Sequence, residues 1–228
     1  MKKTLTITLV IIMVLLISGC IKKNELTDGE KFKEEYEVYN GKTNEDNTYL
    51  TLNIKKDNII KYSNLKEVNQ ILDNGTGVIY LGFPKCPWCR NAVKELLDAS
   101  SSTSLDKIYY VNMQNERDTM KLDADGNIVT TSKASDEYYK LVDKLKDILD
   151  DYIIYDTENN KHNTGEKRIY VPLVLFVRDG ELVGYHKNTV DSQTDPYIEL
   201  NEEQSKELYN IYQTNIHKVL KDMCDDKC

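Results

Sequence analysis

The sequence predicts an α/β protein in which helices flank a central mixed sheet. Apolar runs typical of buried strands alternate along the chain with segments whose apolar residues recur at helical spacing. The clearest pair is the apolar run 78–83 and the helix that begins at Pro87, because proline suits the first position of a helix. Near the C-terminus, the apolar run 169–177 and the hairpin turn Asp179-Gly180 predict two antiparallel strands.

The first elements are predicted from alternation and from capping residues. Residues 49–54 alternate between apolar and polar side chains, as an edge strand does, and residues 59–62 give a second short strand. Asn64 is the expected N-cap of a short helix, with Glu67 as its capping partner. That helix ends at Gly75, since glycine commonly follows the last turn of a helix.

The central elements follow from length and periodicity. Residues 78–83 form a buried strand, residues 87–99 place their apolar side chains on one helical face, and residues 107–112 form the next strand. Residues 114–133 are a polar insert, predicted to be loop with a hairpin turn at Asp125-Gly126.

The second half of the chain is predicted in the same way. Residues 135–151 carry apolar side chains at helical spacing, and the polar residues 157–167 are expected to form a loop. The strand 169–177 pairs with residues 182–186 across the hairpin turn. The last helix, 201–223, has its own apolar stripe, so the order of elements predicts helices on both faces of one sheet.

Residues 1–19 are predicted to be a lipoprotein signal peptide. Lys2 and Lys3 precede an apolar stretch that is too short to span a bilayer, for which about 20 residues are needed. The stretch ends in Ile17-Ser18-Gly19-Cys20, which resembles the bacterial lipobox, where lipid is attached to the cysteine and the peptide is cut before it. Cys20 is therefore the expected lipid attachment point, and an uncleaved signal anchor is the alternative.

The rest of the domain organisation follows from that assignment. Residues 20–48 are charged and turn-forming, and we interpret them as a lipidated tether with a short helix at 31–39. The folded domain is then residues 49–228. Two or three acyl chains hold a protein firmly at a bilayer, so we expect the domain at the outer face of the cell membrane.

The composition limits the function classes. The 228 residues carry a formal net charge of −8, whereas nucleic-acid binding requires clustered lysine and arginine. The same charge argues against adhesion to anionic headgroups, so the lipid has to provide the anchor. The length fits one domain, which we expect to be a monomer. The sequence has no flavin, nicotinamide or phosphate-binding fingerprint, and neither a cofactor nor a metal is expected.

The motif Cys86-Pro87-Trp88-Cys89 places two thiols one helical turn apart, directly after a buried strand. A cysteine at a helix start has its thiolate favoured by the unpaired backbone N–H groups and by the helix dipole. Such a thiolate attacks disulfides, so we predict Cys86 as the nucleophile. Cys89 is then the resolving thiol that releases the partner. Trp88 at the rim would offer a flat contact to a substrate peptide.

Two other roles for the dithiol stay open from the residues alone. A zinc half-site requires a second pair of ligands, and the available ones are Cys224, Cys228 and His217. A purely structural disulfide between Cys86 and Cys89 closes too small a loop to constrain the chain much.

The order of elements and the place of the dithiol resemble the thioredoxin fold over roughly residues 55–223. Within that superfamily, residues 82–90 resemble membrane-anchored thioredoxin-like proteins of Gram-positive bacteria of the bacteriocin-transport accessory type. The Cys-Pro-aromatic-Cys pattern is also similar to that of glutaredoxins. In the family, the proline that opens the later strand is cis and lies beside the dithiol, which leaves the preceding backbone free to pair with an extended substrate. The resemblance implies these roles for Pro172 and Val171.

The chain departs from the thioredoxin pattern at two positions. Thioredoxins keep a buried acid six residues before the first cysteine, and Tyr80 stands there in this chain. Packing in the core and proton relay through its hydroxyl are the alternative roles for Tyr80. Thioredoxins also kink the active-site helix with a proline where this chain has Lys94.

Cys224 and Cys228 form a second pair near the C-terminus, once Cys20 is assigned to lipid. A local disulfide at the end of the last helix is one interpretation. The other is a relay that passes electrons to or from Cys86 and Cys89.

Together these features predict a lipid-anchored, extracytoplasmic thiol-disulfide oxidoreductase. Its expected partners are disulfides or dithiols of secreted and surface proteins, together with a membrane redox partner. The direction of electron flow stays open. The alternative from another class is a non-catalytic accessory lipoprotein for peptide (bacteriocin) export, in which the thioredoxin-like groove holds a partner without turnover.

Overall fold

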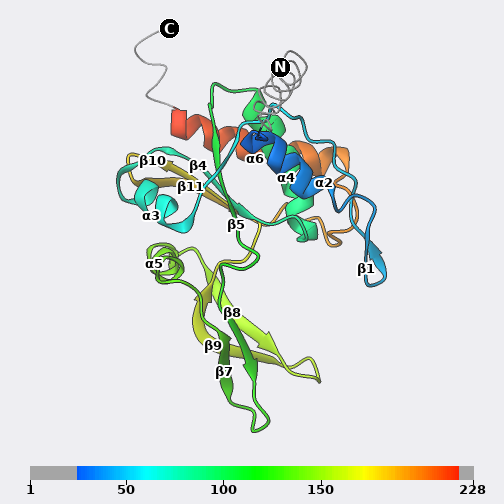
Figure 1. Cartoon of the computed structure of the whole chain (residues 1–228), viewed down its shortest axis with the longest axis vertical. Coiled ribbons are helices and arrows are strands. Elements are labelled where there is room, and N and C mark those ends of the chain that lie inside the picture. The colour runs from blue at the N-terminus through cyan, green and yellow to red at the C-terminus, as the bar shows by residue number, and fades with distance from the viewer. Residues whose placement is uncertain (1–24, 221–228) are drawn as a thin grey trace, which may run out of the picture.

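The computed structural model of the chain, drawn in Figure 1, describes residues 25–220. Its centre is a five-stranded mixed sheet flanked by helices, which confirms the predicted α/β class. In spatial order the strands are β11 (Glu181–Lys187), β10 (Leu173–Arg178), β4 (Gly77–Gly82), β5 (Ile108–Asn112) and β3 (Ile60–Tyr62). β3, β5 and β4 run parallel, whereas β10 and β11 are antiparallel to their neighbours.

The middle strand β4 is buried on both faces, and its side chains feed two separate cores. Val78 and Tyr80 face one core, while Ile79 and Leu81 face the other, as the alternation of a strand requires. The first core is covered by α2 (Asp28–Glu37), α4 (Pro87–Ser101) and α6 (Glu202–Leu220). The second is covered by α3 (Leu65–Asn74) and α5 (Asp136–Leu145). Helices therefore cover both faces of the sheet.

Several predicted helix and strand boundaries are confirmed at their caps. The Asn64 side chain accepts the N–H of Glu67 at the start of α3. Asn201 and Gln204 cap α6 reciprocally, each side chain accepting the other residue's N–H at 3.0 Å. β10 and β11 meet at the predicted hairpin turn Asp179-Gly180, where both residues have positive φ.

The N-terminal helix α2 corrects the predicted tether. The sequence assigned residues 20–48 to a spacer, with a helix at 31–39. The structure places the helix at Asp28–Glu37, behind a capping box at Thr27, and buries Phe32 and Tyr36 completely in the first core. Their spacing of four residues puts both aromatic rings on one helical face. Residues 27–48 therefore belong to the folded domain.

The predicted edge strand at residues 49–54 is absent. Leu52 and Ile54 are buried as the alternation suggested, but the N–H of Leu52 donates to Asn40 Oδ1 at 3.0 Å and that of Ile54 to Glu37 Oε1 at 2.7 Å. Side chains from the end of α2 and the loop after it thus take the hydrogen bonds that a neighbouring strand would have supplied. A two-residue pairing of β1 (Thr43–Asn44) with β2 (Asn47–Thr48) precedes this segment.

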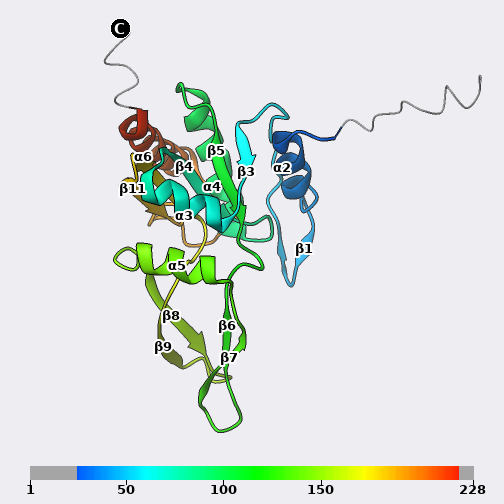
Figure 2. The same ribbon diagram turned by 60° about the vertical axis from the view of Figure 1, so that its left-hand side comes forward.

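Two hairpins project together from the sheet beside α5, as Figure 1 and Figure 2 show. We call them the twin hairpins: β6 (Thr119–Leu122) with β7 (Ile128–Ser132), and β8 (Asp150–Tyr155) with β9 (Lys161–Arg168). The first confirms the predicted turn at Asp125-Gly126. The second was missed, because residues 157–167 read as loop and the preceding helix was expected to reach residue 151.

The turns of the twin hairpins explain why such polar segments pair. Asp123 accepts the N–H groups of Asp125 and Asn127 at 3.0 and 2.8 Å. Asp156 accepts those of Glu158 and Asn160 in the same way, at 2.9 and 2.8 Å. An aspartate whose side chain accepts backbone N–H groups of its own loop favours a tight turn. The turn chemistry is therefore one strand signal, and the buried Tyr152 and Ile154 of β8 supply hydrophobic alternation as a second.

Phe32→Ala tests whether α2 belongs to the core. Removing a fully buried phenylalanine side chain is expected to lower the free energy of unfolding by about 3–5 kcal/mol, measured by chemical denaturation. The matched control is Val38→Ala, since Val38 is 51% exposed at the end of the same helix and should change stability by less than about 0.5 kcal/mol. Equal, small effects of the two changes would restore the tether interpretation.

Candidate active site: the Cys86–Cys89 dithiol

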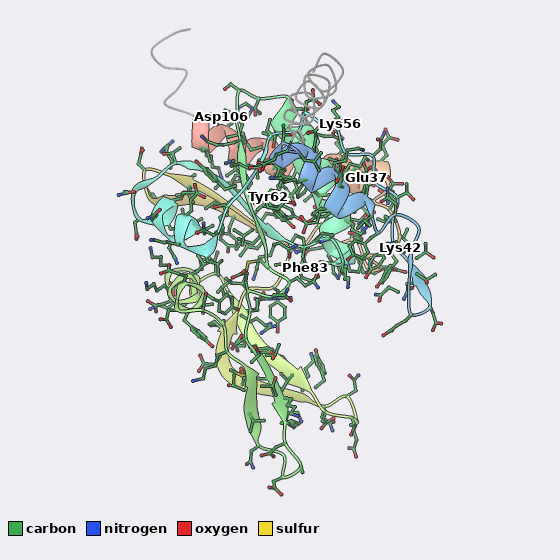
Figure 3. The ribbon with its side chains drawn as sticks, in the orientation of Figure 1. Glu37, Lys42, Lys56, Tyr62, Phe83 and Asp106 are labelled. Carbon is green, nitrogen blue, oxygen red and sulfur yellow. The ribbon has the colours of Figure 1, made fainter. Side chains whose placement is uncertain are left out.

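The dithiol lies where β4 gives way to α4. β4 ends at Gly82, Cys86 is the N-cap of α4, and Pro87 takes the first helical position. The neighbouring strand supports the loop, because the Met113 N–H donates to the Gly82 carbonyl at 2.9 Å. Figure 3 places the side chain of Phe83, which lies between β4 and Cys86 in the sequence, at the junction between the sheet and the twin hairpins.

Two backbone groups lie within hydrogen-bond distance of the Cys86 sulfur. It accepts the backbone N–H of Cys89 at 3.2 Å, which is one of the unpaired groups of the first helical turn. As a thiol it donates to the carbonyl oxygen of Val171 at 3.6 Å. Both cysteines are free thiols, with Cys86 6% and Cys89 0% exposed. Cys86 is therefore the less buried cysteine of the pair.

The pKa of the Cys86 thiol lies below its ordinary value. Burial raises this pKa, but other effects outweigh it. They are hydrogen bonds from the Cys89 side chain and backbone, the charge of the Arg117 guanidinium, and a hydrogen bond from the backbone N–H of Trp88. A lowered pKa means that a larger share of Cys86 is thiolate near neutral pH. The helix start and the Arg117 charge thus both favour the thiolate form of Cys86.

Cys89 behaves in the opposite way. Burial raises the pKa of its thiol well above the ordinary value, and the hydrogen bond to Cys86 and the Cys86 charge raise it further. When one proton is shared by the pair, it therefore stays on Cys89 while Cys86 carries the negative charge. A nucleophile has to be a thiolate while the resolving thiol is still protonated, and this arrangement fits both requirements.

The second half of the predicted site lies beside the sulfur. The Val171–Pro172 peptide bond is cis, and the Val171 carbonyl is the acceptor for the Cys86 thiol. Both residues are buried, and β10 begins directly after them at Leu173. A segment 85 residues further along the chain thus contributes backbone to the site.

The residues flanking the cysteines differ in burial and in contacts. Trp88 is half-buried and packs against the second core, so its ring is not fully presented at the rim. Lys85 lies over the Tyr39 ring at 5.6 Å. Arg90 is completely buried and points toward the N-terminal segment, where its guanidinium donates to backbone carbonyls, including that of Tyr36 at 2.8 Å. Neither cation hydrogen-bonds the Cys86 sulfur.

Arg117 is the site residue that the sequence did not reveal. Its guanidinium lies 5.3 Å from the centre of the Phe83 ring and donates to the Ile169 carbonyl at 3.5 Å. Burial and the nearby Arg168 charge lower the pKa of Arg117, so the site holds an arginine where a cation is costly. Among the described residues, its buried Nε has no hydrogen-bond partner.

One signal in the sequence bears on Arg117. It follows soon after β5, and the carboxyl ends of the parallel strands β4 and β5 meet at one edge of the sheet. A charged residue just past β5 is therefore placed near the residues just past β4. The prediction of an undifferentiated polar loop at 114–133 hid this relation.

Three other predicted site residues lie outside the described part of the chain. Cys20, Cys224 and Cys228 fall outside residues 25–220, so their lipid, disulfide and relay assignments remain predictions. Within the described range, no group of three or more histidine, cysteine, aspartate or glutamate side chains is arranged to hold a metal ion. In the same range, no helix has the length and apolar character needed to cross a membrane.

Comparisons with protein-family models, with curated proteins and with solved structures found no match to this chain. The fold class and the close Cys86–Cys89 pair stand on the structure itself. Function is therefore inferred from the residues around the dithiol.

Arg117→Met is expected to raise the pKa of Cys86, because it removes a positive charge that stabilises the thiolate. Alkylation of Cys86 by iodoacetamide, followed against pH, should slow several-fold at the acidic end of the profile and converge with the wild type at high pH. The control Lys121→Met removes an exposed lysine on β6 and should leave the profile in place. A profile unmoved by Arg117→Met would remove Arg117 from the site.

Proposed function

We propose that the protein is a thiol-disulfide oxidoreductase of thioredoxin-like fold. Three parallel strands followed by an antiparallel pair support this fold assignment, as does a dithiol at the junction of the central strand with its helix. The single observation that carries the function is the position of the Cys86 sulfur, which caps α4, accepts the Cys89 N–H at 3.2 Å and lies 3.6 Å from the Val171 carbonyl. The directions of the two thiol pKa values agree with it. The pKa of Cys86 is lowered despite its burial, whereas burial raises that of Cys89.

The reaction follows from that difference. The Cys86 thiolate attacks one sulfur of a partner disulfide, and the partner's other sulfur leaves with the bonding electron pair and takes up a proton. Cys89 then loses its proton and attacks the Cys86 sulfur, so the mixed disulfide breaks and the partner is released as a dithiol. The partner gains two electrons, and Cys86 and Cys89 become a disulfide. The reverse sequence oxidises a partner dithiol.

The substrate class is a protein disulfide or dithiol in an extended segment. Val171 presents its backbone beside the Cys86 sulfur, which supports the role that the thioredoxin resemblance implies for this residue. The sequence of residues 1–20 leads us to propose further that the enzyme is lipid-anchored through Cys20. It would then act outside the cytoplasmic membrane on secreted or surface proteins, with a membrane redox partner.

Cys89→Ser tests the function directly. Without the resolving thiol, mixed disulfides between Cys86 and its partners should accumulate and be visible on non-reducing gels of cells that express the full chain. The controls are Cys86→Ser and the double variant, neither of which can form these adducts. Full biological activity of Cys89→Ser, without trapped adducts, supports the accessory export protein instead.

A redox titration of the purified protein separates catalysis from a structural disulfide. We expect one two-electron transition of the Cys86–Cys89 pair between about −270 and −120 mV, the range of catalytic dithiols in this fold. A value near the lower limit favours reduction of substrates, and one near the upper limit favours disulfide formation. A potential below about −300 mV, typical of structural disulfides, contradicts the proposal.

A further inference from the structure

Two tyrosine hydroxyls are buried next to the resolving cysteine. Tyr36 comes from α2 and Tyr80 from β4, and both side chains are completely buried. Their hydroxyl oxygens lie 2.8 Å apart, a hydrogen bond in which either can donate. The Tyr80 hydroxyl also donates to the backbone carbonyl of Cys89, at 3.5 Å. A polar pair thus reaches from the N-terminal helix to Cys89.

The surroundings hold the Tyr80 hydroxyl in this position. Its ring stacks on Tyr110, with centroids 5.5 Å apart and an interplanar angle of 25°. Two residues further along β4, Gly82 leaves the space that the hydroxyl fills, since a Cβ there would collide with the Tyr80 oxygen. The Arg90 guanidinium donates a hydrogen bond to the Tyr36 carbonyl at 2.8 Å, which connects Tyr36 to α4.

Cys89 needs such a partner more than Cys86 does. Its sulfur is sealed from water, and a thiolate in an apolar interior is strongly disfavoured. Burial raises the pKa of Cys89, while the Phe83 N–H and the Tyr80 hydroxyl are hydrogen-bond donors that work against this effect. Resolution requires the same buried thiol to become a nucleophile.

We propose that the Tyr36–Tyr80 hydroxyl pair stabilises the Cys89 thiolate as it forms, which makes Tyr80 a catalytic residue of the resolving step and Tyr36 its positioning residue. The Tyr80 hydroxyl has one proton, which it donates to the Cys89 carbonyl in the dithiol state. As the thiolate forms, this proton turns to the Cys89 sulfur, while Tyr36 donates to the Tyr80 oxygen. A donor that itself accepts a hydrogen bond is a stronger donor, because hydrogen bonds in a chain polarise one another. This inference rests on the proposed function.

The step balances without a further reagent. The Cys89 S–H bond breaks, the Cys89 sulfur bonds to the Cys86 sulfur, and the bond between Cys86 and the partner sulfur breaks. The partner sulfur leaves with the bonding electrons and takes up the proton that Cys89 lost. The two tyrosines keep their own protons throughout. Their contribution is to lower the cost of negative charge on Cys89, so it affects the second attack and not the first.

Stopped-flow reaction with an excess of a small aromatic disulfide, whose released thiolate is coloured, separates the two attacks. With Cys20, Cys224 and Cys228 changed to serine, the reduced protein releases one thiolate when Cys86 is modified and a second when Cys89 resolves the adduct. Tyr80→Phe should slow the second phase about tenfold or more, since a hydrogen bond to a charged group has that effect, and leave the first within about twofold. Tyr36→Phe should slow the same phase by a smaller factor.

The matched control is Tyr212→Phe. The Tyr212 side chain is also completely buried. Burial raises the pKa of Tyr212, and the charge of the nearby Cys89 raises it further. Among the described residues, however, the Tyr212 hydroxyl has no hydrogen-bond partner. Its removal should leave both phases unchanged. The pH profile of the second phase should also move to higher pH in Tyr80→Phe, which general loosening of the core would not produce.

The outcomes separate this inference from the proposed function. An unchanged second phase in Tyr80→Phe and Tyr36→Phe overturns the role of the hydroxyl pair, while the wild-type reaction still supports the oxidoreductase. Equal slowing of both phases, or an unmoved pH profile, also overturns it in favour of a structural role. A wild-type protein that never releases the second thiolate overturns the proposed function, and this inference with it. If Tyr80→Phe does not fold, Tyr36→Phe alone decides.

Discussion

The hydrogen bond from the first turn of α4 to the Cys86 sulfur is the interaction on which the site depends. It exists because β4 ends at Gly82 and Pro87 starts the helix, which leaves Cys86 as the N-cap. A sulfur in that position meets unpaired N–H groups without any dedicated side chain. The surrounding residues then affect its charge: Arg117 favours the thiolate, and the Val171 carbonyl accepts a hydrogen bond from the thiol.

The N-terminal segment is part of this arrangement rather than an attachment to it. Arg90, one residue after Cys89, reaches Tyr36, Leu50 and Asn40 and is buried without a carboxylate partner among the described residues. Backbone carbonyls and one amide oxygen satisfy the guanidinium. A buried cation is costly unless it is fully hydrogen-bonded, so the segment from α2 to residue 50 and the active-site helix fold as one unit.

The sequence was informative where local signals and the fold agree. Hydrophobic periodicity and capping residues located the core strands and α3, α4 and α6, and the motif located Cys86 and Cys89. Local signals failed where long-range packing decides: residues 49–54 alternate like a strand, but the side chains of Asn40 and Glu37 take their hydrogen bonds. Arg117 escaped notice because its proximity to Cys86 exists only once β4 and β5 are parallel neighbours.

The twin hairpins add a feature to the core sheet that extends beyond its edge. Their supporting segment leaves the sheet after β5 and returns at β10, and its two ends carry Arg117 and Val171. Those residues are also the cation that acts on the Cys86 sulfur and the carbonyl that it touches. The residues that join the twin hairpins to the sheet thus include the residues that contact or charge-stabilise the Cys86 sulfur. A change in the position of the twin hairpins would therefore also change the surroundings of the Cys86 sulfur.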